Sequence, residues 1–451
     1  MMPPKPASRA DRVSLWRYLK LFRRDLLSAQ PERLYRAWMA EFRTPFFRSF
    51  MINQPELVDL VLKGRPMEFP KSNRIAEGLR PLLGQSVFLT NGAQWKRQRR
   101  IIDPAFEGGR LKDSYQAMHG AALAAAGRMP VGQAVELEEQ CSHAAADVIF
   151  RTLFSIPIEH EVATEVFQLF KDHQRSQPIV NLAAFVPLPR WMPRFHPTKA
   201  KETAAKIRLL IANLVHERQQ EIDNGTAPMD LATKIMTTRD PETGQLFSPE
   251  EMVDQVAIFF LAGHETSASA VAWSLYLLAL FPDWQAKIAD EAAPLDLSDF
   301  SAVSKLKVSR DVFREAMRLY PPVPMMVRQA SQPETFRGRV VPKGAQIVIS
   351  PWHLHRHARL WQDPDGFDPS RWKTANGKEC MRSAFIPFSS GTRVCPGAGF
   401  AMIEGPLLLA TLVSGFNFKA RSSDVPIPAA HLTVRAKNGI TVDVEERSDR
   451  R

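Results

Sequence analysis

The strongest chemical signal in the sequence is a cysteine, Cys395, in the glycine-rich and basic segment FSSGTRVCPG. A thiolate that binds iron needs backbone N–H groups that face the sulfur, glycines that let the chain fold closely around it, and a nearby cation. Gly391 and Gly397 offer that conformational freedom, and Arg393 offers the cation. The run GFAMIEGPLLLATLV that follows predicts a helix, whose N-terminal dipole favours an anion. The segment therefore fits a metal-bound thiolate; the alternative is a buried structural cysteine in a glycine-rich turn.

A second group of polar residues interrupts an apolar stretch. Glu265 and Thr266 follow Ala262 and Gly263 in the run VAIFFLAGHET. A carboxylate and a hydroxyl in such a place cost stability unless they meet a partner or water. Gly263 indicates that something approaches the helix closely or that the helix widens there. The two side chains are candidates for proton transfer; the alternative is a threonine bonded to its own helix and a glutamate that reaches the surface.

Two further pairs of residues have the spacing of neighbours on a helix face. Trp95 and Arg99 lie four residues apart, and an indole N–H beside a guanidinium suits a carboxylate ligand. Glu315 and Arg318 lie three apart among apolar residues, which predicts a partly buried ion pair. A buried pair needs further hydrogen-bonding partners, and Arg371 can provide them.

Together these segments resemble the cytochrome P450 family. The pattern F-x-x-G-x-R-x-C-x-G is similar to the family's haem-ligand signature, and the AGHET run is similar to the oxygen-activating motif of its long central helix. Trp95 to Arg99 match W-x-x-x-R, Glu315 to Arg318 match E-x-x-R, and FDPSRW at 367–372 matches the segment that supplies a third member, Arg371. The motifs occur in the family's order and span residues 95 to 397.

The resemblance implies a role for each matched residue. Cys395 is expected to be the axial ligand of the iron in haem b, iron protoporphyrin IX. Thr266 is expected to hydrogen-bond dioxygen and a water, and Glu265 to help relay protons. The triad of Glu315, Arg318 and Arg371 is expected to hold the cysteine segment in place without a catalytic role. The residues expected to bind the haem, some of them through its propionates, are Trp95, Arg99, Ala262, Arg328, Phe388, Arg393, Cys395 and Gly397.

The activity that this resemblance implies is that of a haem-thiolate monooxygenase. It would hydroxylate or epoxidise an apolar small molecule, such as a terpenoid, a steroid-like compound or a fatty-acyl chain, with O₂. The catalytic body uses all 451 residues, so the two electrons are expected from a separate ferredoxin or flavodoxin with its reductase. The basic residues Lys96, Arg97 and Arg100 are expected to form the docking surface for that acidic protein.

Two other functions stay open at this point. One is a peroxygenase or isomerase on the same scaffold that uses peroxide directly; the acid–alcohol pair of Glu265 and Thr266 argues against it. The other is a haem-binding sensor or carrier without turnover. The substrate pocket of an enzyme is expected to be lined by Phe88, Phe259 and the segments 185–191, 323–326 and 426–432, where phenylalanine and methionine suit a bulky apolar ligand.

The elements that must position these residues are mostly helices. Residues 198–225 carry apolar residues at helical spacing and end in Asn-Gly, which predicts a helix. Ser248, Pro249 and Glu251 predict a helix start with a capping box. The next proline is Pro282, so that helix is expected to run for about 30 residues, or roughly 45 Å.

After about residue 321 the sequence changes to short β-like runs, RVVP and AQIVIS. The alternating runs on either side of 437–439 predict a β-hairpin near the C-terminus. The expected fold is mainly α with a smaller β-containing part, the cytochrome P450 fold with its long central helix over the haem. One catalytic domain is expected over residues 1–451, with a basic N-terminal segment at 1–25 and a polar, frayed tail at 445–451.

Composition excludes several classes of protein. Hydrophobic residues make up 45% and charged residues 24%, which excludes a disordered, collagen-like or coiled-coil chain, and three cysteines exclude a disulfide framework. No nucleic-acid motif accompanies the net charge of +11. The alternating His353, His355 and His357 are interpreted as strand and loop residues, and His264 as a helix-face residue outside the haem pocket.

The same features predict where the protein works. No integral membrane segment is expected, because the most apolar stretch noted outside the N-terminus, 256–262, is far too short for a span. The protein is expected to be soluble, cytoplasmic and monomeric. Its basic N-terminal segment is interpreted as a solvated arm; the alternative is an amphipathic helix on a membrane surface.

Overall fold

The longest described helix, α10 (Pro249–Leu280), begins at the predicted capping box. The Ser248 hydroxyl accepts from the Glu251 backbone N–H at 3.2 Å, and the Glu251 carboxylate accepts from the Ser248 N–H at 3.0 Å. Two donors that the helix cannot satisfy itself are thereby bonded. The helix has 32 residues and ends before Pro282, which confirms the predicted central helix.

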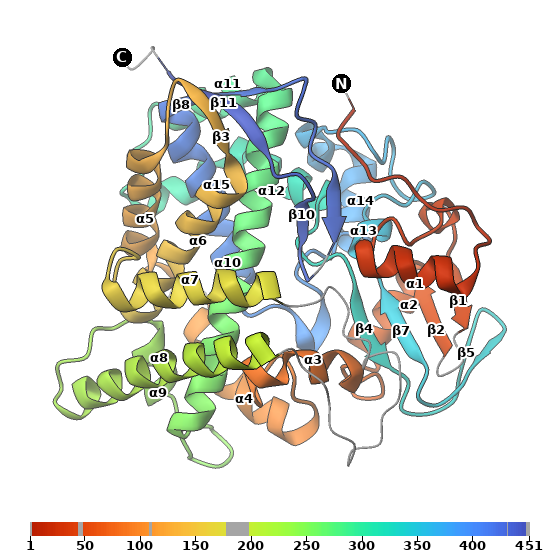
Figure 1. Ribbon diagram of the computed structural model, residues 1–451, viewed down its shortest axis with the longest axis horizontal. Helices are drawn as coiled ribbons and strands as arrows, with labels where there is room; N and C mark the ends of the chain where they lie inside the picture. The colour runs from red at the N-terminus through yellow and green to blue at the C-terminus, as the bar shows by residue number, and fades with distance from the viewer. Residues whose placement is uncertain (1, 44–47, 108–110, 177–197, 431, 448–451) are drawn as a thin grey trace. The chain divides into compact units, whose positions relative to one another are not determined.

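The computed structural model describes residues 2–43, 48–107, 111–176, 198–430 and 432–447, which form two compact units. Unit 1 comprises residues 1–69, 122–144 and 265–451, and unit 2 comprises residues 70–121 and 145–264. Three of the four boundaries fall inside helices, namely α5, α6 and α10 (labelled in Figure 1), so these helices belong partly to each unit.

Unit 2 contains helices joined by loops and turns, and none of the named strands lies in its described residues. Its helices, with the three that continue into unit 1, are α3 (Asn73–Leu83), α4 (Gly92–Phe106), α5 (Tyr115–Arg128), α6 (Leu137–Phe154), α7 (Glu161–Ser176), α8 (Thr198–Asp223), α9 (Leu231–Thr237) and α10. Helix α8 confirms the predicted helix over 198–225, and Gly225 follows it with a φ of +72°, as a helix C-terminus often requires.

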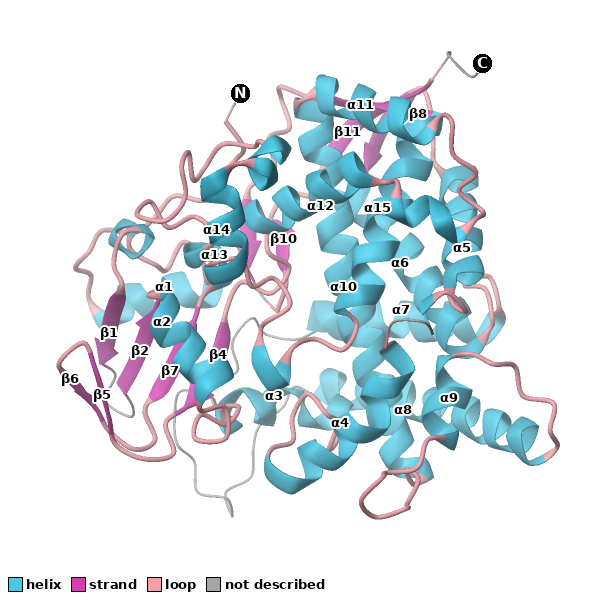
Figure 2. Cartoon of the chain, turned by 180° about the vertical axis from the view of Figure 1, so that it is seen from behind, coloured by secondary structure: helices cyan, strands magenta, loops and turns pink. Residues whose placement is uncertain are grey.

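Unit 1 combines helices with all the described strands (Figure 2). Its remaining helices are α1 (Leu15–Arg24), α2 (Pro55–Asp59), α11 (Pro282–Ala292), α12 (Lys307–Leu319), α13 (Pro351–Leu354), α14 (Ala375–Ser383) and α15 (Ala398–Gly415), with shorter turns η1 (Glu32–Tyr35), η2 (Leu60–Gly64), η5 (Phe300–Ser304), η6 (Pro369–Lys373) and η7 (Gly391–Arg393). Its strands are β1 (Met39–Arg43), β2 (Arg48–Ile52), β3 (Gln133–Glu136), β4 (Met326–Gln329), β5 (Glu334–Phe336), β6 (Arg339–Val341), β7 (Gln346–Ile349), β8 (Phe416–Ala420), β9 (Pro428–Ala430), β10 (Val434–Ala436) and β11 (Thr441–Glu446).

The main sheet of unit 1 has the order β1-β2-β7-β4. Strand β2 pairs with β7 in parallel, with Phe50 opposite Ile347, and the other two pairings are antiparallel. Phe50, Ile347 and Ile349 are fully buried in a cluster with residues of η2 and α13. The sheet therefore carries β4, with Arg328, on a packed core. Strands β6 and β7 confirm the two β-like runs predicted there.

The predicted C-terminal hairpin is wrong. Gly439 does lie in a turn, with a φ of +75°, but the strands on its two sides belong to different sheets. Strand β10 pairs with β9, while β11 lies between β3 and β8. The alternation that predicts a hairpin identifies two strands correctly, but each buries its apolar face against a more distant partner.

Both ends of the described chain are more ordered than the sequence predicts. The Tyr320 hydroxyl donates to the Pro4 carbonyl at 2.8 Å, and Lys5 pairs with Asp365 at 3.1 Å. Glu445 and Glu446 lie in β11, opposite β8. The N-terminal segment is therefore not a detached arm, although the basic side chains of α1 are solvated as predicted, and the prediction of a tail frayed from residue 445 is wrong for Glu445 and Glu446.

One described helix, α15, is long and apolar enough to cross a membrane by length and composition. Of its 18 residues, 72% are buried inside the protein, so it has the properties of a core helix. The sequence predicted no apolar stretch of this length outside the N-terminus. That prediction did not consider α15, whose apolar run continues through Gly405 and Pro406.

Candidate active site

Cys395 differs from the other two cysteines in its surroundings. It is exposed, whereas Cys141 and Cys380 are buried, and burial raises the pKa of the Cys380 thiol to about 11. The Cys395 backbone N–H donates to the Phe388 carbonyl at 2.9 Å, and its carbonyl accepts from the Ala398 N–H at 3.2 Å. Helix α15 begins at Ala398, so the thiol stands at the start of an 18-residue helix. That dipole favours a thiolate, as predicted.

Close packing at Gly391 fixes the shape of the cysteine loop. Gly391 has a φ of +69°, and a Cβ there would lie 2.2 Å from the Leu62 carbonyl oxygen. Only glycine fits this contact with η2. Gly397 has a φ of −79°, and a Cβ there would be in ordinary contact with the cysteine sulfur at 3.9 Å. The conformational freedom predicted for both glycines is therefore required at Gly391 alone.

Two buried arginines belong to the same unit as the cysteine. Arg328 projects from β4 and Arg393 from η7, directly before the loop reaches Cys395. Burial and the neighbouring Arg393 charge lower the pKa of Arg328 to about 10. Its Nε atom is buried without a hydrogen-bond partner, and no described carboxylate lies within ion-pair distance of its guanidinium. Arg328 and Arg393 are both buried and repel each other, so an anion is needed beside them. The described residues do not supply one to Arg328.

These residues fit a haem. Its propionates are carboxylates, and buried guanidinium groups that lack an internal counterion bind carboxylates well. A thiolate at Cys395 would ligate the iron, and the backbone around Gly391 holds the loop that carries it. The donor set on this face of unit 1 therefore matches the group that the sequence predicts.

The predicted triad is present and completely buried. The Arg318 guanidinium contacts the Glu315 carboxylate at 2.8 and 3.0 Å, and Arg371 Nε contacts the same carboxylate at 3.0 Å. Each arginine also donates to backbone carbonyls between residues 355 and 366. Every charge thus has opposite charge and hydrogen bonds around it, which is the condition for a stable buried ion pair. The triad fastens α12 to the chain that leads to the cysteine loop.

The turn of α10 that carries Glu265 and Thr266, the predicted catalytic residues, belongs to unit 1. Glu265 is buried, and its carboxylate accepts from the Thr433 hydroxyl at 3.2 Å and lies 3.8 Å from Arg435. Burial raises the pKa of Glu265, while Arg435 and Thr433 lower it. The carboxyl therefore keeps its proton to a higher pH than an exposed glutamate does. Thr266 follows it and is partly exposed.

Ser267, one residue after Thr266, contacts a buried carboxyl that the sequence did not predict, that of Glu404. The Ser267 hydroxyl donates to the Glu404 carboxylate of α15 at 2.7 Å, and burial raises the pKa of Glu404 to about 7. The pair ties the turn after Thr266 to the helix that follows Cys395. A signal did exist: Glu404 is the single charged residue in the apolar run from 398 to 415.

The neighbours of α10 in unit 2 decide two open questions. A Cβ on Gly263 would lie 2.5 Å from Ile149 Cδ1, so the glycine admits a side chain of α6, and α10 is helical without a break there. His264, predicted as a helix-face residue outside the haem pocket, is buried edge-to-face against Phe167, with ring centroids 5.4 Å apart. Ala262, by contrast, is exposed in the middle of the helix.

Trp95 and Arg99 lie on α4 in unit 2, one turn apart as predicted. Trp95 is buried, and Arg99 pairs with Asp103 at 2.7 Å. Arg99 therefore already has a carboxylate partner, in contrast to Arg328. Their joint action with the unit 1 residues stays a prediction.

The three basic residues of the predicted docking surface carry less uncompensated charge than the sequence indicates. Arg97 pairs with Glu251 at 2.6 Å, and Arg100 pairs with Asp240 at 2.6 Å and Glu242 at 3.0 Å. Two of its three charges are therefore countered within unit 2, and Lys96 remains exposed.

The three alternating histidines are buried packing residues on α13 and the turn after it, not on a strand. Ser350 contacts His353 at 2.8 Å, the Ile386 N–H donates to His355 at 2.9 Å, and His357 stacks on Trp38. Burial lowers the pKa values of His353 and His355 to about 3, so both are neutral at pH 7. The described residues contain no cluster of metal-ligating side chains.

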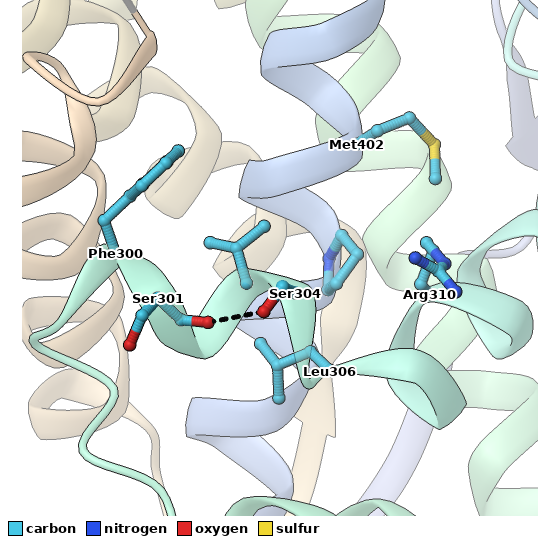
Figure 3. A pocket seen from close by; sticks show the side chains of 8 residues that line it. Phe300, Ser301, Ser304, Leu306, Arg310 and Met402 are labelled. Atoms are coloured by element: carbon cyan, nitrogen blue, oxygen red, sulfur yellow. Dashed lines mark hydrogen bonds between the residues drawn. The ribbon is translucent and has the colours of Figure 1, made fainter. Parts of the chain in front are cut away.

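The substrate-pocket residues are only partly described. Residues 185–191 lie outside the described residues, as does position 431. Phe88 is exposed, and Phe259 contacts Phe106 edge-to-face at 5.8 Å. A separate hollow of about 390 Å³ lies elsewhere in unit 1, between η5 and α15, with Phe300, Leu306 and Met402 on its walls (Figure 3). It does not include Cys395.

Comparisons with known proteins identify the family. The cytochrome P450 family profile matches residues 34–443. Cyclooctat-9-en-7-ol 5-monooxygenase of Streptomyces melanosporofaciens is 30% identical over 87% of this chain and 84% of its own length. Cyclooctatin synthase of the same organism is 28% identical over 86% and 83%, and a cytokinin hydroxylase of Arabidopsis thaliana is 28% identical over 86% and 77%.

Solved structures show the same fold. The haem domain of cytochrome P450DA superposes with a TM-score of 0.78 at 22% identity, over 99% of this chain and 98% of that one, and a mutant form gives 0.81 at 23% with the same coverage. The expected fold, mainly α with a smaller β-containing part, is confirmed. With the family profile spanning most of the chain and the cysteine loop, triad and central helix in the places the motifs predict, the chain belongs to the cytochrome P450 family.

Proposed function

We propose that this haem-thiolate monooxygenase binds haem b through Cys395 and oxygenates a bulky apolar substrate, of terpenoid, steroid-like or fatty-acyl character. The observation that carries the proposal is the pairing of an exposed thiol at the start of α15 with two buried arginines, one of which lacks an internal counterion. When bound, the haem supplies an iron that activates O₂: with two electrons and two protons, one oxygen atom enters the substrate and the other leaves as water.

The chain's own residues have the remaining tasks. Arg328 and Arg393 bind carboxylates of the haem, with Trp95 and Arg99 as further ligands and Ala262, Phe388 and Gly397 as packing contacts. Glu265 holds a proton in a buried site, and Thr266, the next residue, passes it toward dioxygen. The raised pKa of Glu265 supports this assignment, because a carboxyl that ionises nearer to neutral pH can both accept and donate a proton.

The electrons are proposed to come from a ferredoxin or flavodoxin with its reductase. The whole chain is taken as one catalytic domain that is soluble, cytoplasmic and monomeric. Lys96 remains the exposed charge of the predicted docking surface, so we expect the partner to use further contacts besides Lys96, Arg97 and Arg100.

The first experiment tests the ligand. Purified protein, reduced under carbon monoxide, should show the red-shifted Soret band of a thiolate-bound haem, and C395S should lose it while C380S retains it. If C395S kept the band as C380S does, the assignment of Cys395 as the ligand would be overturned.

A second experiment seeks the substrate, through shifts in the spin state of the bound haem. The first compound to test is cyclooctat-9-en-7-ol, which appears in the name of the Streptomyces relative. Turnover with NAD(P)H and a reconstituted redox chain, but not with peroxide alone, would separate the monooxygenase from the peroxygenase and the sensor.

A further inference from the structure

Helix α1 presents a basic face to solvent. It carries Arg17, Lys20, Arg23 and Arg24, all exposed, and contains no acidic residue. None of the four lies in an ion pair with a described residue, although Asp11, just before the helix, pairs with Arg33 at 3.7 Å. Four uncompensated cations on ten residues make this a strong local concentration of positive charge.

A tryptophan projects from the same face. Trp16 is 84% exposed, the highest value among the large apolar side chains of the described residues. Lys20 and Arg23 follow it at i+4 and i+7, so the indole and two cations lie side by side on the helix surface. Exposure of so large an apolar group costs free energy in water unless a partner covers it.

The helix is already formed and fastened to unit 1. Tyr18 on its inner side contacts Phe22 at 5.6 Å between ring centroids, and the Arg9 guanidinium lies 5.5 Å from the Tyr18 ring. At its C-terminal end the Asp25 carboxylate accepts from the Ala430 N–H at 2.8 Å. In Figure 1, α1 lies in front of the main sheet of unit 1. A partner would therefore bind a helix that is already folded, so little conformational entropy would be lost on binding.

More exposed apolar side chains lie beside that end. The Leu26 N–H donates to the Ala430 carbonyl at 3.2 Å, which places the end of α1 next to β9. Near β9, Ile427 is 50% exposed and Leu432 is 42% exposed. Single exposed side chains of this kind are ordinary, and these two lie near the C-terminal end of α1, at the opposite end of the helix from Trp16.

We propose that the exposed face of α1 docks on the surface of an anionic lipid bilayer. Cations would lie at the headgroups while Trp16 enters the interface, the depth that an indole prefers. A bilayer fits better than an acidic protein because Trp16 stands out fully and a rigid partner would need a matching hollow for it. Reversible binding would bring a cytoplasmic enzyme to a surface where apolar substrates accumulate.

Binding of the intact holoenzyme to lipid vesicles tests the docking proposal without any turnover. A negative result would therefore not bear on the proposed oxygenation. We expect binding to phosphatidylcholine vesicles that contain phosphatidylglycerol, weaker binding with added salt, and little binding to pure phosphatidylcholine. Each removed cation should weaken binding about fivefold, so R17Q/K20Q should weaken it about 25-fold. W16A should weaken it about tenfold.

The matched control is K378Q/R382Q on α14, a helix of similar length in the same unit, whose two exposed basic residues flank the exposed Met381. That variant should bind like the parent. Equal binding to neutral and anionic vesicles, or the same affinity for W16A, R17Q/K20Q and the parent, would overturn the proposal. So would loss of binding to an acidic ferredoxin in the α1 variants with vesicle binding intact, which would assign this face to a protein partner.

Discussion

At the scale of single residues, the buried carboxyl of Glu404 on α15 makes the stability of this protein depend on pH. Glu404 is completely enclosed, bonded by Ser267 at 2.7 Å, and its pKa is raised by burial from 4.5 to about 7. Below pH 4.5 the carboxyl is protonated in both the folded and the unfolded chain, so it has no effect. Between 4.5 and about 7 the unfolded chain releases the proton first, so rising pH favours unfolding.

Replacing this acid should flatten that dependence. The loss of stability between pH 4.5 and 7 from Glu404 amounts to about 3 kcal/mol. E404Q keeps a donor and acceptor for Ser267 but cannot ionise, so its free energy of unfolding should fall less over that range. Denaturant titrations of parent and variant at several pH values measure the difference. E217Q, an exposed glutamate on α8, should follow the parent, and identical profiles for all three proteins would contradict the assignment.

The triad allows a second prediction at this scale. R371A removes one cation from a carboxylate that is fully buried, and leaves Glu315 with a single arginine. Loss of one partner of a buried ion pair costs about 3–5 kcal/mol. The control is D59A, which breaks an exposed pair with Lys63 at 2.8 Å and should cost less than about 1 kcal/mol. Thermal unfolding and haem content together measure both effects; equal losses in the two variants would count against a structural triad.

At the scale of elements, the chain positions its chemistry by close contacts between loops and helices. Gly391 and Gly132 have nearly the same φ, +69° and +71°, but a Cβ meets the Leu62 carbonyl at the first and nothing within 4 Å at the second. Alanine costs about 1–2 kcal/mol at either position for the left-handed conformation. Only G391A must also move the cysteine loop away from η2.

G391A should therefore lose bound haem, whereas G132A should retain it with a modest drop in thermal stability. The ratio of haem absorbance to protein, measured on purified samples, compares the two directly. Equal haem content in both variants would mean that the contact with η2 does not hold the loop in its binding shape.

The same scale shows what sequence can and cannot predict. The cap of α10, the cysteine loop and the triad follow from local chemistry, because each depends on residue types at fixed short spacings. The hairpin prediction fails because alternation identifies β10 and β11 but not their partners: β11 pairs with β3, whose residues lie about 300 positions earlier. Glu404 was missed for a similar reason, since Ser267 is 137 residues away in the chain.

At the scale of the whole molecule, the N-terminal segment is part of the fold of unit 1. Within that unit, two residues near the N-terminus contact positions more than 300 residues later in the chain: Pro4 accepts from Tyr320, and Lys5 pairs with Asp365. Arg9 adds a bond closer in sequence, to the Ala29 carbonyl at 2.6 Å. Most of the chain must therefore be present before these contacts form, and their bonds must outweigh the entropy that is lost in closing so long a loop.

Deleting residues 2–10 removes all three contacts but leaves α1 and its cap, Ser14, in place. Hydrogen bonds and part-buried ion pairs of this kind contribute about 1 kcal/mol each, so the deletion should lower the free energy of unfolding by about 2–4 kcal/mol. Y320F removes the Pro4 bond alone and should cost about 1 kcal/mol. Because the anionic-vesicle face lies on α1, the shortened holoenzyme should still bind vesicles where it stays folded. A shortened chain as stable as the parent would show that the segment rests on unit 1 without stabilising it.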